Sequence, residues 1–406
     1  MAELDKVSWW DVYAATDVDQ ASDIFTKKIT NILDKMAPVK KFQIRTKYAA
    51  WLSDGTKDNI KLRDLAQQAA SISGSTEDWN EYKRLRNKIT VALGVDKDNW
   101  QRKNLEECEN KNDSSKLWKN VLGWLNWSST SSPTKLLHQG RMESSPAKMA
   151  DIQNQFYVEK VRQIRRSMPE SRRDPLATLK RQLRSRTSTF SLQPVAPEQV
   201  DKIIKHLRNS KSAGVDQLDT YILKLARKKI VPAVCHILNL SIQSNRFPTK
   251  WKIAKVVPLY KGKGSLFDPK NFRPVAILPI LSKVLERAIF LQVLGYMDRE
   301  NFFNPNHHAY RSFHSTTTAM LQMYDTWLDA VEQGDLAGVC MVDMSAAFDV
   351  VDTQLLLKKL ELYGFDRRTV QWMWSYLTYR SQGVYIEGSM SGLLPLEAGV
   401  PQGSIL

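Results

Sequence analysis

The sequence is poor in cysteine, and its three cysteines stand far apart, at positions 108, 235 and 340. Without a Cys-x-x-Cys pair, neither a disulfide framework nor a zinc site is expected, and a reducing intracellular setting fits. Long apolar runs are lacking too: none approaches the roughly 20 residues that a membrane-spanning helix needs. The first residues lack the basic-then-apolar pattern of a secretory signal peptide. These absences favour a soluble intracellular protein with no membrane partner.

Acidic residues are also in short supply, and the shortage is local. The 406 residues contain 59 Lys and Arg against 43 Asp and Glu, which gives a net charge of +16. Residues 151–290 alone hold 28 basic and 10 acidic side chains, a local balance of +18. A basic block inside a folded region is typical of proteins that bind a phosphate backbone. A solvated basic surface is the alternative that charge alone leaves open.

The first 130 residues are expected to be helical. Apolar residues at helical spacing predict helices over 21–36, 76–108 and 114–125. The spacing of Trp79, Tyr82 and Leu85 is more typical of a helix core than of a binding stripe. A polar cluster at 126–133 predicts a linker, and an Arg- and Ser-rich stretch at 168–189 predicts a second boundary.

From residue 197 the pattern changes to alternating helices and short strands. Apolar segments of helical length lie at 197–209, 221–227, 231–243, 281–296, 316–332 and, as a helix pair, 354–379. Short apolar segments between turn residues predict strands at 252–260, 272–278, 337–342, 383–386 and 393–396. The length allows two or three domains. This order of elements predicts an α+β domain with a small sheet.

The predicted strand at 337–342 delivers Asp343 at its end, where a hard cation could bind at the sheet edge. Mg²⁺ prefers oxygen ligands and keeps several waters, so one carboxylate and nucleotide phosphates can begin a site. Two such ions hold the attacking and leaving oxygens in phosphoryl transfer. Taken alone, the same aspartate would also suit the cap of a following helix.

Two loops carry further polar groups. Gly403 closes a tight Gly-Val-Pro-Gln-Gly loop whose backbone can approach a ligand closely, and the Gln402 amide could contact a nucleotide or a template base. Lys261, Lys263 and Arg273 flank the glycine turn of the first hairpin, a layout that aims cations at a triphosphate. Taken alone, the loop that ends at Gly403 could be an ordinary turn. The hairpin with Lys261 and Arg273 could likewise be an ordinary exposed basic hairpin.

The order and spacing of these segments resemble the reverse transcriptases of non-LTR, jockey-like retrotransposons. The resemblance covers about residues 197–406, with a weaker match upstream at 79–87 and 116–118. Its motifs follow one another in a fixed order. They are Lys-Ser-Ala-Gly-Val-Asp (211–216), Phe-Pro-x-x-Trp (247–251), Val-Pro-Leu-Tyr-Lys-Gly-Lys-Gly (257–264), Asn-Phe-Arg-Pro-Val-Ala-Ile-Leu-Pro (271–279), Ser-Lys-Val-Leu-Glu (282–286), Tyr-Arg with His-Ser-Thr (310–316), Asp343 to Asp349, and Gly-Val-Pro-Gln-Gly-Ser (399–404).

The resemblance implies a right-hand polymerase. Its parts would be a helical region over 1–130, a basic linker or extension over 131–196, fingers over 197–336 and a partial palm over 337–406. The implied partners are an RNA template, a DNA primer or target and deoxynucleoside triphosphates. Action in the nucleus is implied as well, whereas the oligomeric state is not indicated.

The resemblance also implies roles for single residues. Asp343 would be the first catalytic, metal-binding aspartate, with Mg²⁺ or alternatively Mn²⁺ as the cofactor. Phe348 matches the bulky side chain that excludes a ribose 2′-hydroxyl group. The remaining residues would bind substrates: Lys261 and Arg273 the triphosphate, Gln402 and Gly403 the nucleotide and template side, and Lys211, Lys263 and Arg311 nucleic acid.

One motif of the family does not follow within this sequence, namely the aromatic-x-Asp-Asp turn that supplies the other metal-binding carboxylates. Because one carboxylate cannot assemble a two-metal site, we expect this chain not to polymerise DNA. Asp349 is expected in the turn after Asp343, with a structural role. The unpaired palm strand predicts an exposed edge, an exposed apolar face and poor solubility.

Two other readings compete with this one. The first is a non-catalytic, basic nucleic-acid-binding remnant that uses residues 151–290, with affinity that falls steeply with salt. The second is another right-hand polymerase relative, such as a group II intron maturase. The motif at 211–216 and the tryptophan-rich N-terminal helices disfavour the maturase.

Overall fold

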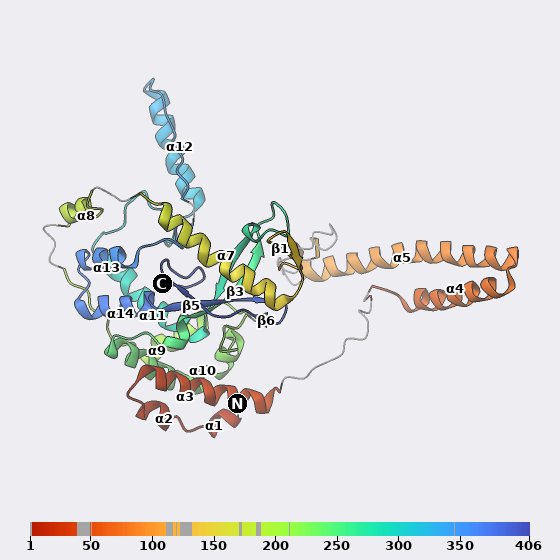
Figure 1. The fold of residues 1–406 in the computed structure, drawn as a ribbon, viewed down its shortest axis with the longest axis horizontal. Coiled ribbons are helices and arrows are strands. Elements are labelled where there is room, and N and C mark those ends of the chain that lie inside the picture. The colour runs from red at the N-terminus through yellow and green to blue at the C-terminus, as the bar shows by residue number, and fades with distance from the viewer. Residues whose placement is uncertain are drawn as a thin grey trace. The chain divides into compact units, whose positions relative to one another are not determined.

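A computed structural model describes residues 2–38, 49, 51–110, 117–118, 120–121, 132–169, 173–183, 188–210, 212–344 and 346–406. The chain divides into two compact units: unit 1 is Met1–Pro38 with Ser131–Leu406, and unit 2 is Val39–Thr130 (Figure 1). Residues 1–38 therefore cluster with the C-terminal part of the chain, whereas the sequence had grouped them with residues 39–130. The boundaries of linker, fingers and palm stay predictions.

Unit 2 contains a hairpin of two helices, α4 (Asp54–Ser73) and α5 (Thr76–Asn110). The Ser53 hydroxyl caps the start of α4 by accepting a hydrogen bond from the Thr56 N–H. Gly74 ends the helix at φ 64°, a left-handed conformation that glycine adopts without a steric penalty. Helix α5 confirms the helix predicted at 76–108.

The burial of α5 differs from the expectation. Leu85 is buried, but Trp79 is 37% exposed and packs edge-on against the Tyr82 ring at 5.7 Å. A two-helix hairpin buries only one narrow stripe of each helix, so a third large side chain at this spacing stays at the surface. The helix predicted at 114–125 and the linker at 126–133 lie largely outside the described residues.

Unit 1 has a helical layer around α10 (Thr220–Ser244), which is flanked by α9 (Pro197–His206), α11 (Ile280–Arg299) and the N-terminal helices α1 (Ala2–Asp5), α2 (Trp10–Ala14) and α3 (Val18–Met36). The two helices predicted at 221–227 and 231–243 are one continuous helix, which corrects the expectation. Pro232 lies inside it. An internal proline costs about 3 kcal/mol, and burial of side chains on both sides of it offsets that cost.

Ion pairs join the N-terminal helices to the segment that follows α10. The Arg246 guanidinium lies 2.9 Å from the Asp17 carboxylate, and Lys250 lies 2.8 Å from Asp23. Phe25, which is fully buried in α3, joins the same hydrophobic cluster as α10. Apolar contact and charge pairing together explain why residues 1–38 belong to unit 1.

The sheet of unit 1 has β3 (Ile253–Tyr260) at its centre. Strand β4 (Phe272–Ile277) pairs with it antiparallel and β5 (Arg380–Ile386) pairs with it parallel. Strands β6 (Ser389–Met390) and β7 (Leu394–Leu396) both pair with β5. Two short strands, β1 (Leu136–His138) and β2 (Arg141–Glu143), form a separate hairpin. The strands predicted at 252–260, 272–278, 383–386 and 393–396 are thereby confirmed.

Helix α7 (Pro146–Ser167) packs against β5, β6 and β7 and covers one face of this sheet (Figure 1). The other helices of unit 1 are α8 (Ala177–Gln182), α12 (Thr316–Glu332), α13 (Thr353–Leu362) and α14 (Arg367–Leu377), and two 3-10 turns precede β3 (Thr249–Lys252) and β4 (Pro269–Asn271). The predicted α+β fold class is confirmed. No helix among the described residues is long and apolar enough to cross a membrane.

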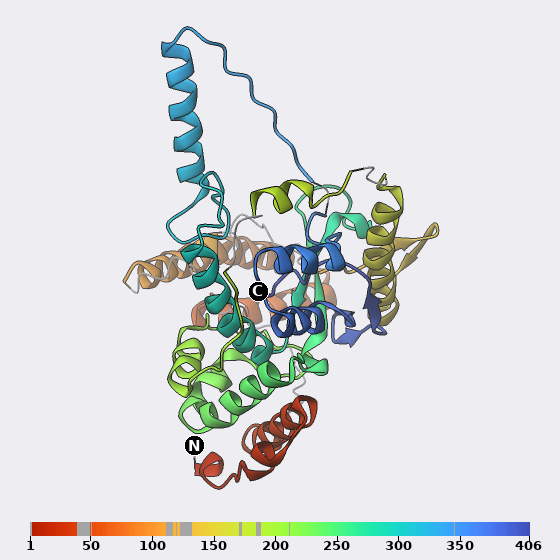
Figure 2. The same cartoon turned by 90° about the vertical axis from the view of Figure 1, so that its left-hand side faces the viewer.

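The strand predicted at 337–342 does not form, which is a second correction. Figure 2 shows an extended trace after α12 in place of a strand. Its apolar side chains are exposed: Met341 is 86% and Val342 is 79% accessible. A strand needs a neighbour that satisfies its backbone N–H and C=O groups, and within the described residues none pairs with this segment.

Candidate functional site

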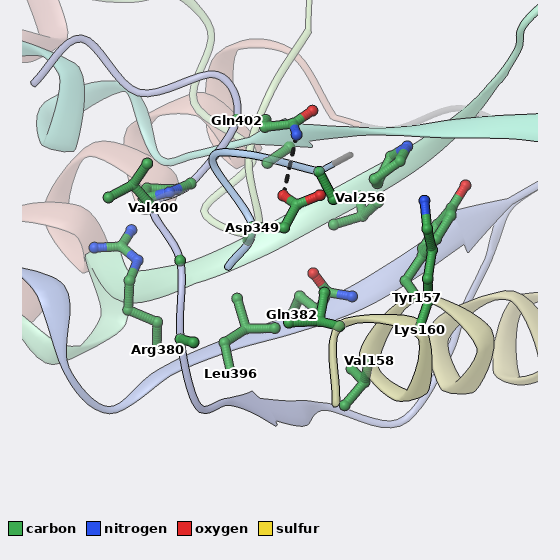
Figure 3. A pocket seen from close by; sticks show the side chains of 18 of the residues that line it. Tyr157, Val158, Lys160, Val256, Asp349, Arg380, Gln382, Leu396, Val400 and Gln402 are labelled. Atoms are coloured by element: carbon green, nitrogen blue, oxygen red, sulfur yellow. Dashed lines mark hydrogen bonds between the residues drawn. The ribbon is translucent and has the colours of Figure 1, made fainter. Parts of the chain in front are cut away.

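A cavity of about 230 Å³ lies in unit 1 between α7, the β3–β4 hairpin and the loop at 396–402 (Figure 3). Apolar side chains such as Val256 and Phe272 form part of its wall. Its polar lining is mostly cationic: Lys160, Arg162, Arg165, Lys261, Arg273 and Arg380 are set against Asp349 and Glu397. Such a lining suits an anion.

The hairpin places two cations at this cavity. Residues Leu259 and Arg273 are cross-strand partners, and the Lys261 N–H donates to the Asn271 carbonyl at 2.9 Å, which closes the ladder. The turn then uses Gly264 at φ 83°, where the left-handed backbone favours glycine. Lys261 and Arg273 both line the cavity, as the sequence predicted for a triphosphate-binding pair.

The loop at 399–403 lies along the edge of β4. The Ala276 N–H donates to the Gln402 carbonyl at 3.1 Å, so the loop satisfies an edge group of the strand. Gly403 has φ 122°, and a Cβ there would stand 2.3 Å from the Ala276 carbonyl oxygen. Only glycine allows this close approach, which carries the Gln402 side chain to the cavity.

Asp349 faces the Gln402 side chain. The Gln402 Nε2 group donates to Asp349 Oδ1 at 3.0 Å (Figure 3). The backbone supports this contact, since the Val400 N–H donates to the Phe348 carbonyl at 2.9 Å and Gly399 packs on the Asp349 backbone. Burial raises the pKa of Asp349, while Lys160 and the Gln402 amide lower it. The expected turn position of Asp349 is confirmed, but its place in the cavity lining was missed.

Helix α7 supplies three cations that the sequence analysis assigned only to a basic extension. Arg162 pairs with Glu397 at 2.6 Å and Arg165 with Asp352 at 3.3 Å. Lys160 also lines the cavity. The excess of basic residues after position 151 indicated that this segment could bind an anion. Charge alone could not predict that the segment packs as a helix on the sheet beside the cavity.

Arg380, at the start of β5, was also missed. It is 3% exposed, and its Nη1 group donates to the Tyr376 carbonyl at 2.7 Å. Its Nη2 group is buried, and no described residue forms a hydrogen bond with it. Burial lowers the pKa of Arg380, and Tyr376 and Glu286 raise it. A β-strand arginine looks like a surface residue in sequence, so no local pattern could have found it.

Four predicted site residues lie elsewhere. Asp343 is exposed on the extended segment, and Phe348 is 46% exposed with its ring edge-on to Tyr310 at 6.1 Å. Arg311 donates to the Asn304 and His307 carbonyls, and Lys263 occupies the hairpin turn. None of the four lines the cavity, and neither does Gly403, which adjoins Gln402 in the loop. Lys211 lies outside the described residues.

Carboxylates are sparse around Asp343. Among the described residues, no group of three or more His, Cys, Asp or Glu side chains is placed to hold a metal ion. Asp349 is engaged by Gln402. These residues therefore do not by themselves fit a two-metal centre.

Known proteins share this sequence pattern. The reverse transcriptase (RNA-dependent DNA polymerase) family matches residues 260–406. The RNA-directed DNA polymerase from mobile element jockey of Drosophila funebris is 23% identical over 400 residues, which cover 97% of this chain and 43% of that protein. The Drosophila melanogaster protein of the same name is 29% identical over 219 residues, 54% of this chain and 24% of that protein.

A more distant relative is the retrovirus-related Pol polyprotein from type-1 retrotransposable element R2 of Popillia japonica. It is 24% identical over 216 residues, 53% of this chain and 29% of that protein. The chain thus spans less than half the length of these relatives. The family match begins at the end of β3 and includes Arg273, Asp349 and Gln402 of the cavity. Residues 260–406 therefore match the reverse transcriptase family, and the chain is similar to RNA-directed DNA polymerases of jockey and other non-LTR retrotransposons.

Proposed function

We propose that this chain carries the nucleotide-binding part of an RNA-directed DNA polymerase from a mobile element. One observation supports this above all: Lys261 and Arg273 of one hairpin line a single cationic cavity with Gln402, which lies far along the chain. Two of them are cations on a rigid hairpin, which suits a triphosphate. The third carries an amide whose direction is fixed by Asp349. The substrates would be deoxynucleoside triphosphates, and the other partners an RNA template and a DNA primer or target in the nucleus.

These residues would bind and orient the nucleotide and would take no covalent part in the reaction. Lys261 and Arg273 would neutralise phosphate oxygens, while the Gln402–Asp349 pair would hold the loop backbone against β4 beside the nucleotide. Preorganised donors of this kind lower the cost of ordering a flexible triphosphate chain. Phe348 would exclude a ribose 2′-hydroxyl group, and Lys211, Lys263 and Arg311 would contact nucleic acid.

The reverse transcriptase family uses a divalent metal ion, and we propose Mg²⁺, with Mn²⁺ as the alternative, at Asp343. In the family such ions supply charge stabilisation at the transferring phosphate. The described residues of this chain do not complete that site. Binding of the triphosphate to Lys261 and Arg273 does not depend on that metal site. This binding is therefore the property of the chain that can be tested.

The test is binding of dTTP by calorimetry at fixed ionic strength. Lys261→Ala and Arg273→Ala should each weaken binding about tenfold, the value of one charge-assisted contact. Lys270→Ala removes one positive charge from the same hairpin, where Lys270 pairs with Asp268 and does not line the cavity, so it should change binding by less than about twofold. If all three variants bind dTTP alike, the cavity is not the nucleotide site.

A second candidate function is the non-catalytic nucleic-acid-binding remnant, which the local charge of +18 over residues 151–290 favours. It predicts RNA and DNA affinity that falls steeply with salt and does not depend on dTTP. Primer extension separates the two candidates further. We expect none from this chain, and Mg²⁺-dependent extension that is lost in Asp343→Ala would contradict that expectation and the remnant together.

A further inference from the structure

The cations of α7 differ in how they are engaged. Arg162 and Arg165 each form an ion pair with a carboxylate, Glu397 and Asp352 respectively, and Glu397 itself lines the cavity. Within the part of the chain that the structure describes, Lys160 forms no such pair and its ammonium group donates no hydrogen bond, although it lines the same cavity. It is the α7 cation whose charge is available to a ligand.

The helix holds Lys160 in a fixed place. Tyr157 is 6% exposed and Val158 is 8% exposed. Tyr157, one turn before Lys160, packs in the cluster that also contains Val256 and Phe272 of the sheet. Figure 3 shows Tyr157 and Lys160 extending from α7 in the same direction at the cavity. Because the helix is anchored here, the lysine needs to order only its own side chain to bind a ligand.

Lys160 lines one cavity together with Lys261 and Arg273 of the hairpin and Gln402 of the loop. Burial lowers the pKa of Lys261, and the charges of Lys160 and Arg273 lower it further. The same lysine lowers the pKa of Asp349. Lys160 therefore shares the cavity with the hairpin cations and with the carboxylate that holds Gln402. Three cations around one small cavity repel each other until an anion joins them.

We propose that Lys160 is a third ligand of the phosphate chain, so that α7, which lies upstream of the matched reverse transcriptase domain, completes the triphosphate site together with Lys261 and Arg273. This inference rests on the proposed function of the cavity. It assigns α7 to substrate binding in addition to its packing role on the sheet. The lysine acts as a binding residue and takes no covalent part.

The size of the cavity favours a free triphosphate over a nucleic-acid backbone. Its volume of about 230 Å³ and its apolar walls leave room for a compact anion. A backbone would need a continuous groove, and most of the basic side chains of residues 151–290 do not line this cavity. A site for a free triphosphate and a site for a nucleic-acid backbone are distinguished by measuring tripolyphosphate binding and oligonucleotide binding separately.

The experiment measures binding of inorganic tripolyphosphate to the full chain by calorimetry, and binding of a single-stranded oligonucleotide by fluorescence anisotropy. The variants are Lys160→Ala, Lys160→Met, which keeps the aliphatic stem, and Lys160→Arg, which keeps the charge. Lys148→Ala is the matched control, because Lys148 is an exposed lysine of the same helix that pairs with Glu143 away from the cavity.

Lys160→Ala and Lys160→Met should weaken tripolyphosphate binding about tenfold, with Lys160→Arg close to the parent chain. Lys148→Ala should leave binding within about twofold, and the melting temperatures of all four variants should agree. Equal binding by Lys160→Ala and Lys148→Ala would overturn the proposal, as would a loss confined to the oligonucleotide.

The failure of the inference can be told from the failure of the proposed function. If Lys261→Ala and Arg273→Ala lose tripolyphosphate while Lys160→Ala keeps it, the cavity is the phosphate site without α7. If none of the three loses it, the proposed function itself is wrong.

Discussion

Two regions of unit 1 carry equally clear apolar patterns in the sequence and end up in opposite states. The hairpin β3–β4 is paired and buried on one face, with Val256 1% and Phe272 1% exposed. The segment 336–344 is extended and open, with Leu336 fully accessible and Met341 86% accessible. Both were predicted to be strands beside a polymerase site. Only the first has a neighbour.

The difference teaches what an apolar run does and does not specify. Its side chains favour a β conformation, but the conformation is stabilised only when another strand takes up the backbone hydrogen bonds and covers the apolar face. In the hairpin, β4 and β5 do both for β3. At 336–344, no described strand does either. Because the predicted strand does not form, its exposed edge and apolar face stay untested, although the apolar side chains of the segment are exposed. The predicted poor solubility stays a prediction.

The largest expected effect comes from truncating an apolar side chain on each side of the comparison. Phe272→Ala should lower the free energy of unfolding by about 3–5 kcal/mol, since it empties a packed site. Met341→Ala should change it by less than about 0.5 kcal/mol, because the side chain is already in water. Urea unfolding of the two variants measures both values. Similar losses would show that the segment 336–344 is packed after all.

A smaller effect is expected from adding a methyl group to one glycine in each region. Gly403→Ala should cost about 1–3 kcal/mol, because φ is 122° and the new Cβ would meet the Ala276 carbonyl oxygen. Gly338→Ala meets nothing within 4 Å and should be neutral or stabilise by up to about 0.5 kcal/mol. Thermal melts read out stability, and dTTP affinity should fall only in Gly403→Ala. Retained affinity there would argue against a site built by the loop.

The smallest effect concerns pH. Burial raises the pKa of Asp349 above its ordinary value of 3.8, so the native state favours the protonated carboxyl. The stability that this group contributes is complete below 3.8 and is lost as the pH rises through the folded pKa. Asp349→Asn should therefore gain stability relative to the parent chain as the pH rises, by less than about 1 kcal/mol after solvent screening.

Urea unfolding at a series of pH values measures this difference. Asp343→Asn is the control variant, because it removes one negative charge from the exposed segment and so reports the general effect of losing that charge. A difference between Asp349→Asn and the parent chain that shrinks as the pH rises would contradict the assigned direction of the Asp349 pKa.

Much of the local structure could be predicted. Caps, turn residues and periodicity are properties of neighbouring residues, so α5, α12 and the β3–β4 hairpin begin and end close to their predicted bounds. The errors arose where distant contacts decide. A break was predicted between the helices at 221–227 and 231–243, but α10 is continuous and buried there, and Trp79 has the spacing of a core residue in a hairpin too thin to bury it.

The candidate site divides in the same way. Lys261, Arg273 and Gln402 could be singled out because each belongs to a short motif, and all three line the cavity. Lys160 and Arg380 belong to no motif and enter the cavity only because α7 and β5 pack where they do. Asp349 was placed in its turn, but its hydrogen bond to a side chain 53 positions later has no local signature.

The sequence by itself determined the family resemblance, the α+β class and most element boundaries, because these depend on residue types at short spacing. Tertiary structure alone decided which apolar run becomes a strand, which cations share a cavity and which carboxylate faces Gln402. Those outcomes depend on contacts between segments far apart in the chain, and the free energy of such contacts is set by packing and hydrogen-bond partners that no local pattern contains.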